Sequence, residues 1–159
     1  MFEYLHYVED TLGKERDADM LFYGLKFNGF NTVFDGEIYT DANILMHFGA
    51  PSFYSETTGK KAEGLILIGN FLLQTTFPQG KSRIFFYGFG PMFKYTHYDL
   101  EVPNGAESKT YSADDLNIGV LFNVGYSFRV SDLSLHLDAK YYWEKTSYYG
   151  LGLNVGWEY

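Results

Sequence analysis

The side chains with the most versatile chemistry in this sequence are four histidines, His6, His47, His97 and His136. A histidine that is oriented by an acid can activate a serine hydroxyl, or a water molecule, for attack on an ester. The candidate partners that lie near His47 or His97 in the sequence are Ser52, Ser55, Glu56 and Asp99. Nothing in their spacing distinguishes them from ordinary loop residues, so ester chemistry is an alternative hypothesis only.

Metal and cofactor motifs are weak in this sequence. Asp114, Asp115 and the acidic residues of DTLGKERDAD offer oxygen ligands for Ca²⁺, but they lack the ordered spacing of a calcium loop. NGAESKT does not match a P-loop, and no dinucleotide fingerprint is present. The chain has no cysteine, which removes thiolate chemistry and disulfides. The sequence therefore predicts no metal site and no cofactor.

The composition is aromatic, acidic and compatible with one domain over residues 1–159. Aromatic residues make up 20% of the chain, the net charge is −8, and the mean hydropathy is only −0.20. The charge argues against a nucleic-acid partner, which requires clustered Lys and Arg. No apolar run reaches the length of a membrane helix. The N-terminus lacks the basic and apolar regions of a secretory signal, which indicates either a cytoplasmic protein or a signal removed before Met1.

Strict alternation of apolar and polar residues recurs along the chain and predicts β-strands. The turn chemistry of NGFN predicts a tight turn between the second and third strands, and Pro91 predicts irregular pairing in the fifth. No helix of useful length is expected. Long connections are expected at 10–19, 49–63 and 99–115. The eight expected strands cover residues 2–9, 20–28, 32–48, 64–77, 82–98, 116–130, 133–144 and 148–159.

Volume decides which face of these strands is buried. The apolar faces sum to roughly forty residues, whereas an eight-stranded barrel encloses little more than its own packed side chains. The apolar face must then lie outside, against lipid, with Gly, Asn, Ser and charged residues in the interior. An ion in such an interior needs a partner, so the lumen is expected to hold a salt-bridge network. Its expected members are Glu3, Lys26, Asp35, Glu37, Asp41, Lys94, Arg129, Asp138, Lys140, Glu144 and Glu158.

Amphipathic aromatic rings are expected at both edges of the apolar band, where they form the two girdles of a membrane barrel. Trp143 falls at one end of the seventh strand and Trp157 at the opposite end of the eighth. The first girdle is expected to contain Phe48, Tyr95 and Trp143, and the second Phe77, Phe128, Trp157 and Tyr159.

The final stretch, YGLGLNVGWEY, resembles the C-terminal strand by which small outer-membrane barrels are recognised by the barrel assembly machinery. The matching positions are Leu151, Leu153, Val155, Trp157 and Tyr159, although phenylalanine is the commoner last residue. Over its whole length the chain resembles the eight-stranded OmpA/OmpX-like barrels of Gram-negative bacteria. The resemblance implies that the termini and short turns lie in the periplasm, that the long loops face outside, and that a signal peptide preceded Met1.

The function that follows from this resemblance is that of a non-enzymatic outer-membrane protein. Its outer loops would serve adhesion or envelope integrity by contacting a host or surface ligand, and its other partners would be lipopolysaccharide and the assembly machinery. Phe53, Tyr54 and Tyr111 are candidate loop contacts, with packing within the girdle or the loop as the alternative for all three. One alternative is a lipid A acyltransferase or deacylase using His47 or His97, although the His-x-Ser pattern of the deacylases is missing. A second is a soluble lipocalin-like carrier, although its N-terminal Gly-x-Trp is absent.

Overall fold

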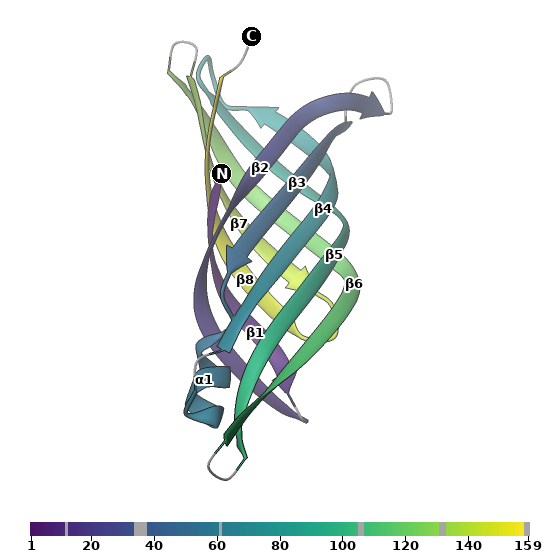
Figure 1. The fold of residues 1–159 in the computed structure, drawn as a ribbon. Helices are drawn as coiled ribbons and strands as arrows, with labels where there is room; N and C mark the ends of the chain where they lie inside the picture. Colours follow the sequence, from purple (N-terminus) through teal and green to yellow (C-terminus); the bar gives the residue numbers. More distant parts are fainter. Residues whose placement is uncertain (12, 34–37, 61, 105–106, 131–132, 158–159) are drawn as a thin grey trace.

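In the computed structural model the chain forms a closed antiparallel barrel in which each strand pairs with its sequence neighbours and β8 returns to β1 (Figure 1). The structure describes residues 1–11, 13–33, 38–60, 62–104, 107–130 and 133–157. Its strands are β1 (Phe2–Thr11), β2 (Lys14–Val33), β3 (Ile38–Phe48), β4 (Ala62–Pro78), β5 (Arg83–Asn104), β6 (Glu107–Val130), β7 (Leu133–Trp143) and β8 (Ser147–Trp157). The sequence-based prediction of an all-β, eight-stranded up-and-down barrel is thus confirmed.

The alternating apolar face lies on the outside of the barrel. On β6, for example, Ile118 is 77% exposed whereas Leu121 and Asn123 on the opposite face are buried. The same division holds on β8, where Leu151, Leu153 and Val155 are exposed. This band of exposed apolar side chains is the reverse of a soluble protein, which rarely leaves apolar patches beyond a few hundred Å² uncovered.

The expected long loops at 10–19 and 99–115 are wrong, because both segments are mostly strand. β1 and β2 pair as far as Thr11 and Lys14, and Gly13 turns the chain with a φ of 75°. β5 and β6 pair as far as Asn104 and Glu107. Beyond the apolar band both faces of a hairpin meet water, so the hydrophobic alternation ends while backbone pairing continues. We call the end of the barrel that carries these hairpins the loop end, and the opposite end the terminal end.

The expected turn at NGFN is also wrong. Asn28 and Gly29 lie inside β2, and the register between β2 and β3 shifts between Phe27 and Asn31. Gly29 has a φ of 57°, and its N–H donates to Asp41 Oδ1 at 2.8 Å. The turn-forming dipeptide is therefore accommodated as a β-bulge. At Pro91, which lacks an N–H, pairing with β4 is interrupted without any change of register.

The expected loop at 49–63 contains a short helix, α1 (Ser52–Thr58), which the sequence analysis did not anticipate. Gly59 ends the helix in the left-handed conformation, with a φ of 64°, and its N–H donates to the carbonyl of Ser55 at 2.9 Å. Figure 1 shows α1 at the loop end of the barrel, opposite the C-terminus. In the part of the chain that the structure describes, no helix is long and apolar enough to cross a membrane.

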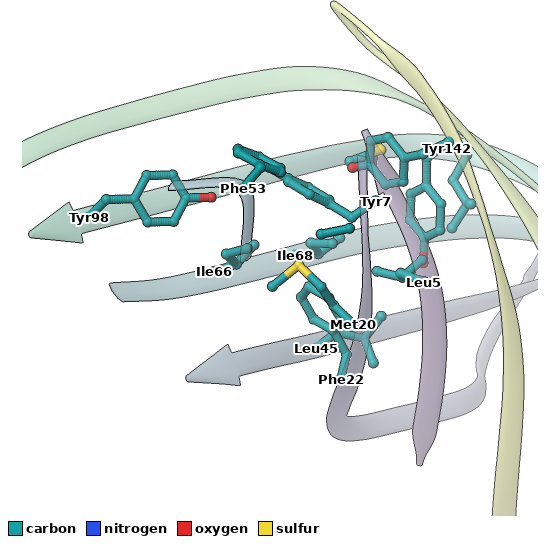
Figure 2. Close-up of a cluster of buried hydrophobic side chains, with 14 of the residues drawn as sticks. Leu5, Tyr7, Met20, Phe22, Leu45, Phe53, Ile66, Ile68, Tyr98 and Tyr142 are labelled. Carbon is teal, nitrogen blue, oxygen red and sulfur yellow. The ribbon is translucent and has the colours of Figure 1, made fainter. Parts of the chain in front are cut away.

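The interior has two zones rather than the uniformly polar lumen expected. Near the loop end it is aliphatic and aromatic, and Phe53 of α1 packs into this zone (Figure 2). Both faces of β4 are largely apolar, and its side chains Ile66, Ile68 and Leu72 face inward into this zone with no exposed surface. Burying these groups away from both water and lipid closes the mouth of the barrel by packing. The remaining interior is mostly polar, and Phe86 is buried within it beside Lys26.

Candidate functional site

The polar zone centres on five charged side chains from four strands. Lys140 Nζ donates to Glu3, and Glu3 also accepts from the Tyr142 hydroxyl. Lys26 Nζ lies 3.7 Å from Asp41 Oδ2 and 4.0 Å from Asp138 Oδ2. Asp138 Oδ1 lies 3.9 Å from Lys140 Nζ, so the two lysines share this carboxylate. All five side chains are at most 2% exposed, so their charges are balanced by one another; both oxygens of Asp138 take part through ion-pair contacts without a hydrogen bond.

A second ion pair joins β5 to the end of β7. Lys94 Nζ lies 2.5 Å from Glu144 Oε1, with both side chains at most 3% exposed. The same ammonium lies over the rings of Tyr7 and Tyr148, at 4.8 and 5.2 Å from their centroids. The aromatic faces stabilise the cation through their quadrupoles. This pair marks the boundary between the polar zone and the apolar zone.

Two glycines of β8 give the ion pairs the room they occupy. A Cβ added at Gly152 would lie 1.9 Å from Asp138 Oδ1, and one added at Gly150 would lie 2.7 Å from Glu3 Oε1. The inward positions 150 and 152 of β8 are therefore glycines because a larger side chain there would clash with carboxylates from β1 and β7. Their spacing is a consequence of the interior network.

The structure places most of the expected lumen residues in the interior. Glu3, Lys26, Asp41, Lys94, Asp138, Lys140 and Glu144 form the contacts described above. Arg129 lies on the same face of β6 as the buried Asn123 and Ser127, but it is exposed at the terminal end, where the barrel opens to solvent. Asp35, Glu37 and Glu158 lie outside the described residues.

The expected girdle residues lie on the outer face wherever the structure describes them. Phe48 and Trp143 are exposed near the loop end, by 65% and 57%, and Tyr95 is half-buried there. At the terminal end, ring contacts run from Phe77 through Phe85 and Tyr126 to Phe128 across three strands. The side chain of Trp157 and residue Tyr159 lie outside the described part of the chain. The assignment of these rings to membrane boundaries stays a prediction.

Sequence analysis missed a cluster of three tyrosines around Glu9 at the mouth of the barrel. Glu9 Oε2 accepts from Tyr7 at 3.0 Å and from Tyr98 at 3.3 Å, and Oε1 accepts from Tyr54 at 2.8 Å. Tyr54 belongs to α1, so the carboxylate ties the helix to β1 and β5. The signal in the sequence was that Glu9 shares the inward face of β1 with Glu3. Phe53 is only 4% exposed and packs in the apolar zone, so it follows the packing alternative and is not an exposed loop contact.

Replacing Tyr54 by phenylalanine is expected to loosen α1 without unfolding the barrel. A hydrogen bond to a charged group contributes about 1.5–3 kcal/mol, which corresponds to roughly tenfold or more in the population of the open helix. Trypsin cleavage after Lys60 should accelerate by that factor. The matched control is Tyr95→Phe, which removes a hydroxyl that donates to Asp114 and not to Glu9. Equal cleavage rates in the two variants would show that the Tyr54 hydroxyl does not hold the helix.

His97 lies at the centre of a polar cluster on the outer face, just beyond the apolar band. Its Nδ1 is 2.9 Å from Asp114 Oδ1, and its Nε2 is 3.5 Å from Asp99 Oδ2. Asp114 also accepts from the Tyr95 hydroxyl at 2.6 Å, and Asp99 accepts from Ser112. The hydrogen bond to Asp114 raises the pKa of His97 above its ordinary value. Bonds from Tyr95 and His97 lower the pKa of Asp114.

The pKa of His97, followed by NMR, is expected to lie above the ordinary value of about 6.5 and to fall when Asp114 is replaced by asparagine. Because the folded-state pKa is raised, the pair stabilises the fold fully below the unfolded pKa and loses this contribution as pH rises through the folded pKa. Asp115→Asn is the control, since Asp115 bonds Asn117 instead. A His97 pKa that is unchanged by Asp114→Asn would contradict the pairing.

The described residues do not bring His47 or His97 within hydrogen-bonding distance of a serine hydroxyl. His47 Nδ1 bonds the carbonyl of Leu21 at 2.8 Å, and Ser55 donates to the carbonyl of Ser52. His6 pairs with Asp19 at 3.0 Å. The His–Ser contact that the structure does contain joins His136 Nε2 to Ser134 Oγ at 3.1 Å, on the interior side of β7. Among the described residues, this geometry places no serine hydroxyl beside His47 or His97, as the alternative of a lipid-modifying enzyme with a serine nucleophile would need.

The candidate calcium ligands are likewise not brought together by the fold. Among the residues that the structure describes, no group of three or more His, Asp or Glu side chains is arranged to hold a metal ion. Asp114 and Asp115 lie side by side on β6, but their carboxylates accept from different neighbours, Tyr95 and Asn117. Asp17 and Asp19 lie on β2, within the stretch that was expected to be a loop.

Comparison with known proteins agrees with the architecture. No protein-family model and no curated protein matches the chain. Among solved structures, the chain is similar to Ail, the attachment invasion locus protein of Yersinia pestis, in a crystal structure with the heparin analogue sucrose octasulfate. The TM-score is 0.61 and the sequence identity 10%, over 98% of this chain and 92% of that one. At this identity the likeness concerns the fold.

The chain therefore has the fold of the small eight-stranded outer-membrane β-barrels, the OmpA/OmpX-like class to which its sequence pattern pointed. Strand number, ring closure and the outward apolar face all agree with that class.

Proposed function

We propose that this chain is a non-enzymatic integral outer-membrane protein of a Gram-negative bacterium that contacts partners through its loop end. The observation that carries the proposal is the inverted distribution of side chains: apolar residues surround the barrel, and paired ions fill its centre. Such a ring satisfies the backbone hydrogen bonds of every strand within the protein, as a bilayer requires. A soluble carrier would need the opposite distribution.

The interior also favours this proposal over a lipophilic carrier. A carrier needs an apolar cavity inside the barrel, whereas this interior holds two ion-pair groups and amide pairs such as Asn43–Asn70, at 2.6 Å. The space at the terminal end, about 230 Å³, has a mixed lining of polar groups such as Asp41 and His136 and apolar ones such as Ile84 and Phe86. These features support a closed barrel whose interior contributes stability and whose ends contact partners.

Two further partners belong to this proposal. The outward face of β8, with Leu151, Leu153 and Val155 exposed, would present the alternating apolar positions that the assembly machinery recognises. The apolar band would contact lipopolysaccharide in the outer leaflet. Both follow from the resemblance and from the exposure of these side chains.

The loop end is the surface that would contact host or envelope partners. Tyr111 is 50% exposed there and carries Lys109 Nζ 5.1 Å from its ring centroid. The described loop-end surface carries more carboxylates than cations, unlike a surface built to bind a sulfated polysaccharide. Its exposed carboxylates include Glu15, Asp17, Glu56, Glu63, Glu101, Glu107, Asp114 and Asp115, and its exposed cations are Lys14, Arg16, Lys60, Lys109 and Lys145.

Single cysteines test this proposal, because the chain has none of its own. Ser108→Cys lies at the loop end and Gln79→Cys, its control, at the terminal end; both positions are exposed. In intact cells that export the chain to the outer membrane, a membrane-impermeant maleimide should label Cys at 108 at once and Cys at 79 only after permeabilisation. Labelling of both in intact cells, or recovery of the chain in the soluble fraction, would contradict the proposal.

The enzyme alternative is tested separately. His47→Ala and His97→Ala variants, the intact chain and an empty control are compared for their lipid A acyl patterns. We expect four identical patterns. An acyl pattern that changes with the intact chain and reverts in either variant would establish the enzyme instead.

A further inference from the structure

A cleft of about 560 Å³ opens at the loop end between α1, the β1–β2 hairpin and β5. Its floor is formed by Phe53, Tyr54 and Leu100, and its border by Lys14, Arg16 and Thr57. A volume of this size is that of an ordinary small-molecule site, in which an apolar lining is combined with a few placed polar groups.

The strand residues that line the cleft all occupy inward-facing positions. Lys14 and Arg16 share the face of β2 that carries the buried Ala18, Met20 and Phe22. Leu100 likewise follows the buried Lys94, Thr96 and Tyr98 along β5. The cleft therefore lies within the mouth of the ring, beside the packed zone whose side chains Figure 2 shows, and faces the solvent rather than the surrounding lipid.

The two cations of this cleft have no anionic partner among the described residues. No ion pair involves Lys14 or Arg16 within the part of the chain that the structure describes, and both side chains are exposed. The nearest inward-facing carboxylate on the facing strand belongs to Glu9, which is paired with Arg16 in register, but its oxygens accept from three tyrosines. Glu15 and Asp17 alternate to the other face of β2.

The polar side chains of α1 that line the cleft already have hydrogen-bond partners. The hydroxyl of Thr57 donates to the carbonyl of Phe53 at 2.8 Å, and the Tyr54 hydroxyl donates to Glu9. The helix thus offers the cleft mainly hydrocarbon and aromatic surface, with the positive charge confined to the hairpin. The rest of the loop end is acidic, so the cleft is a local site of positive charge.

We propose that this cleft binds an organic anion with an apolar body, such as an aromatic or acyl carboxylate, sulfate or sulfonate, that arrives from the solvent. The apolar body lies on Phe53 and Leu100, and the anionic group pairs with Lys14 and Arg16. The proposal rests on the proposed function, since it gives a ligand class to the same loop end. Charge complementarity selects the anion, and the inward-facing lining selects a free molecule over a membrane lipid.

The test uses the barrel in zwitterionic phosphatidylcholine nanodiscs, with naphthalene-2-sulfonate as the probe and 2-naphthylmethylammonium as its cationic match. Backbone amide shifts of α1 and of the β1–β2 hairpin are followed by NMR. We expect saturable binding of the sulfonate, at least about tenfold tighter than that of the ammonium. Equal binding of the two probes, or no saturable shift, would overturn the proposal.

Charge variants sharpen the result. Lys14→Gln with Arg16→Gln should weaken sulfonate binding at least tenfold. Lys60→Gln with Lys109→Gln, which removes the same charge from outside the cleft, should change it less than twofold. Equal losses in the two double variants would reduce the effect to general electrostatics and overturn the site. Leu100→Ser, which keeps both cations, should also weaken binding, and an unchanged affinity would contradict the apolar floor.

Two further controls distinguish a failure of the cleft proposal from a failure of the proposed function. Adding anionic phosphatidylglycerol to the nanodiscs without the probe should leave the same amides unshifted, whereas shifts there would assign the cleft to membrane lipid and contradict a soluble ligand. Unboiled samples on an SDS gel report whether each variant is folded. A folded barrel at the cell surface that binds no sulfonate disproves the cleft alone; a chain absent from the outer membrane disproves the proposed function.

Discussion

Replacing Glu3 by leucine is expected to destabilise the folded barrel by about 3–5 kcal/mol, because it leaves a buried ammonium without its closest counter-ion. Glu3 has no exposed surface and accepts from both Lys140 and Tyr142. The remaining carboxylate near Lys140 is Asp138, at 3.9 Å, which also serves Lys26. The measurement is urea unfolding in detergent micelles, with the folded fraction read from unboiled gel mobility.

The matched double variant isolates the charge. Glu3→Leu combined with Lys140→Met replaces the pair by apolar groups of similar volume, and such replacements are often neutral or stabilising. Most of the stability lost in Glu3→Leu should therefore return. Glu15→Leu, at an exposed position on β2, should change the free energy of unfolding by less than about 0.5 kcal/mol. A loss below about 1 kcal/mol for Glu3→Leu would show that the network does not stabilise the interior.

Replacing Val124 by arginine is expected to cost about 2–4 kcal/mol if the outer face meets the bilayer. Val124 is 44% exposed and lies in the middle of the outward apolar run of β6, between Leu116 and Val130. A guanidinium there must either enter hydrocarbon or distort the bilayer. The measurement is the free energy of unfolding of the barrel refolded into phospholipid vesicles.

Ser108→Arg is the control for this substitution, since it places the same side chain on the same strand but beyond the apolar band. It should leave the unfolding free energy within about 0.5 kcal/mol of the original. In a soluble barrel, arginine at position 124 would be as harmless as at 108. Equal stabilities of the two variants in vesicles would therefore refute the lipid-facing interpretation of β6.

The barrel could be predicted from the sequence because its strands alternate over long stretches and because one face was too voluminous to fit inside. That reasoning works only where the two faces meet different surroundings. The hairpins that end at Gly13 and between Asn104 and Glu107 extend past the apolar band, so their sequences look like polar loops although their backbones are paired. At the edge of the apolar band the alternation of apolar and polar residues stops, whereas the pairing of the strands continues.

The candidate site was predictable in part for the same reason. Charges such as Glu3, Lys26 and Lys140 could be assigned to the interior from parity alone, but parity does not say which lysine meets which carboxylate. The Glu9 cluster needs Tyr54, 45 residues away on a short helix whose sequence carries no long amphipathic repeat. The cleft needs that helix and the β1–β2 hairpin together, so no single segment of sequence reveals it.

The most direct test of the central claim, that the exposed apolar face meets lipid and the alternate face does not, is a spin-label scan of β6. Single cysteines at 120, 122 and 124 occupy the outward face, and those at 121 and 123 the interior; the chain supplies no competing thiol. In a bilayer, collision rates with oxygen should be high at the outward positions and low at the interior ones, and collision with a water-soluble nickel complex should be low at all five. High nickel accessibility at 122 and 124, with a folded chain that remains in solution without lipid, would contradict the account.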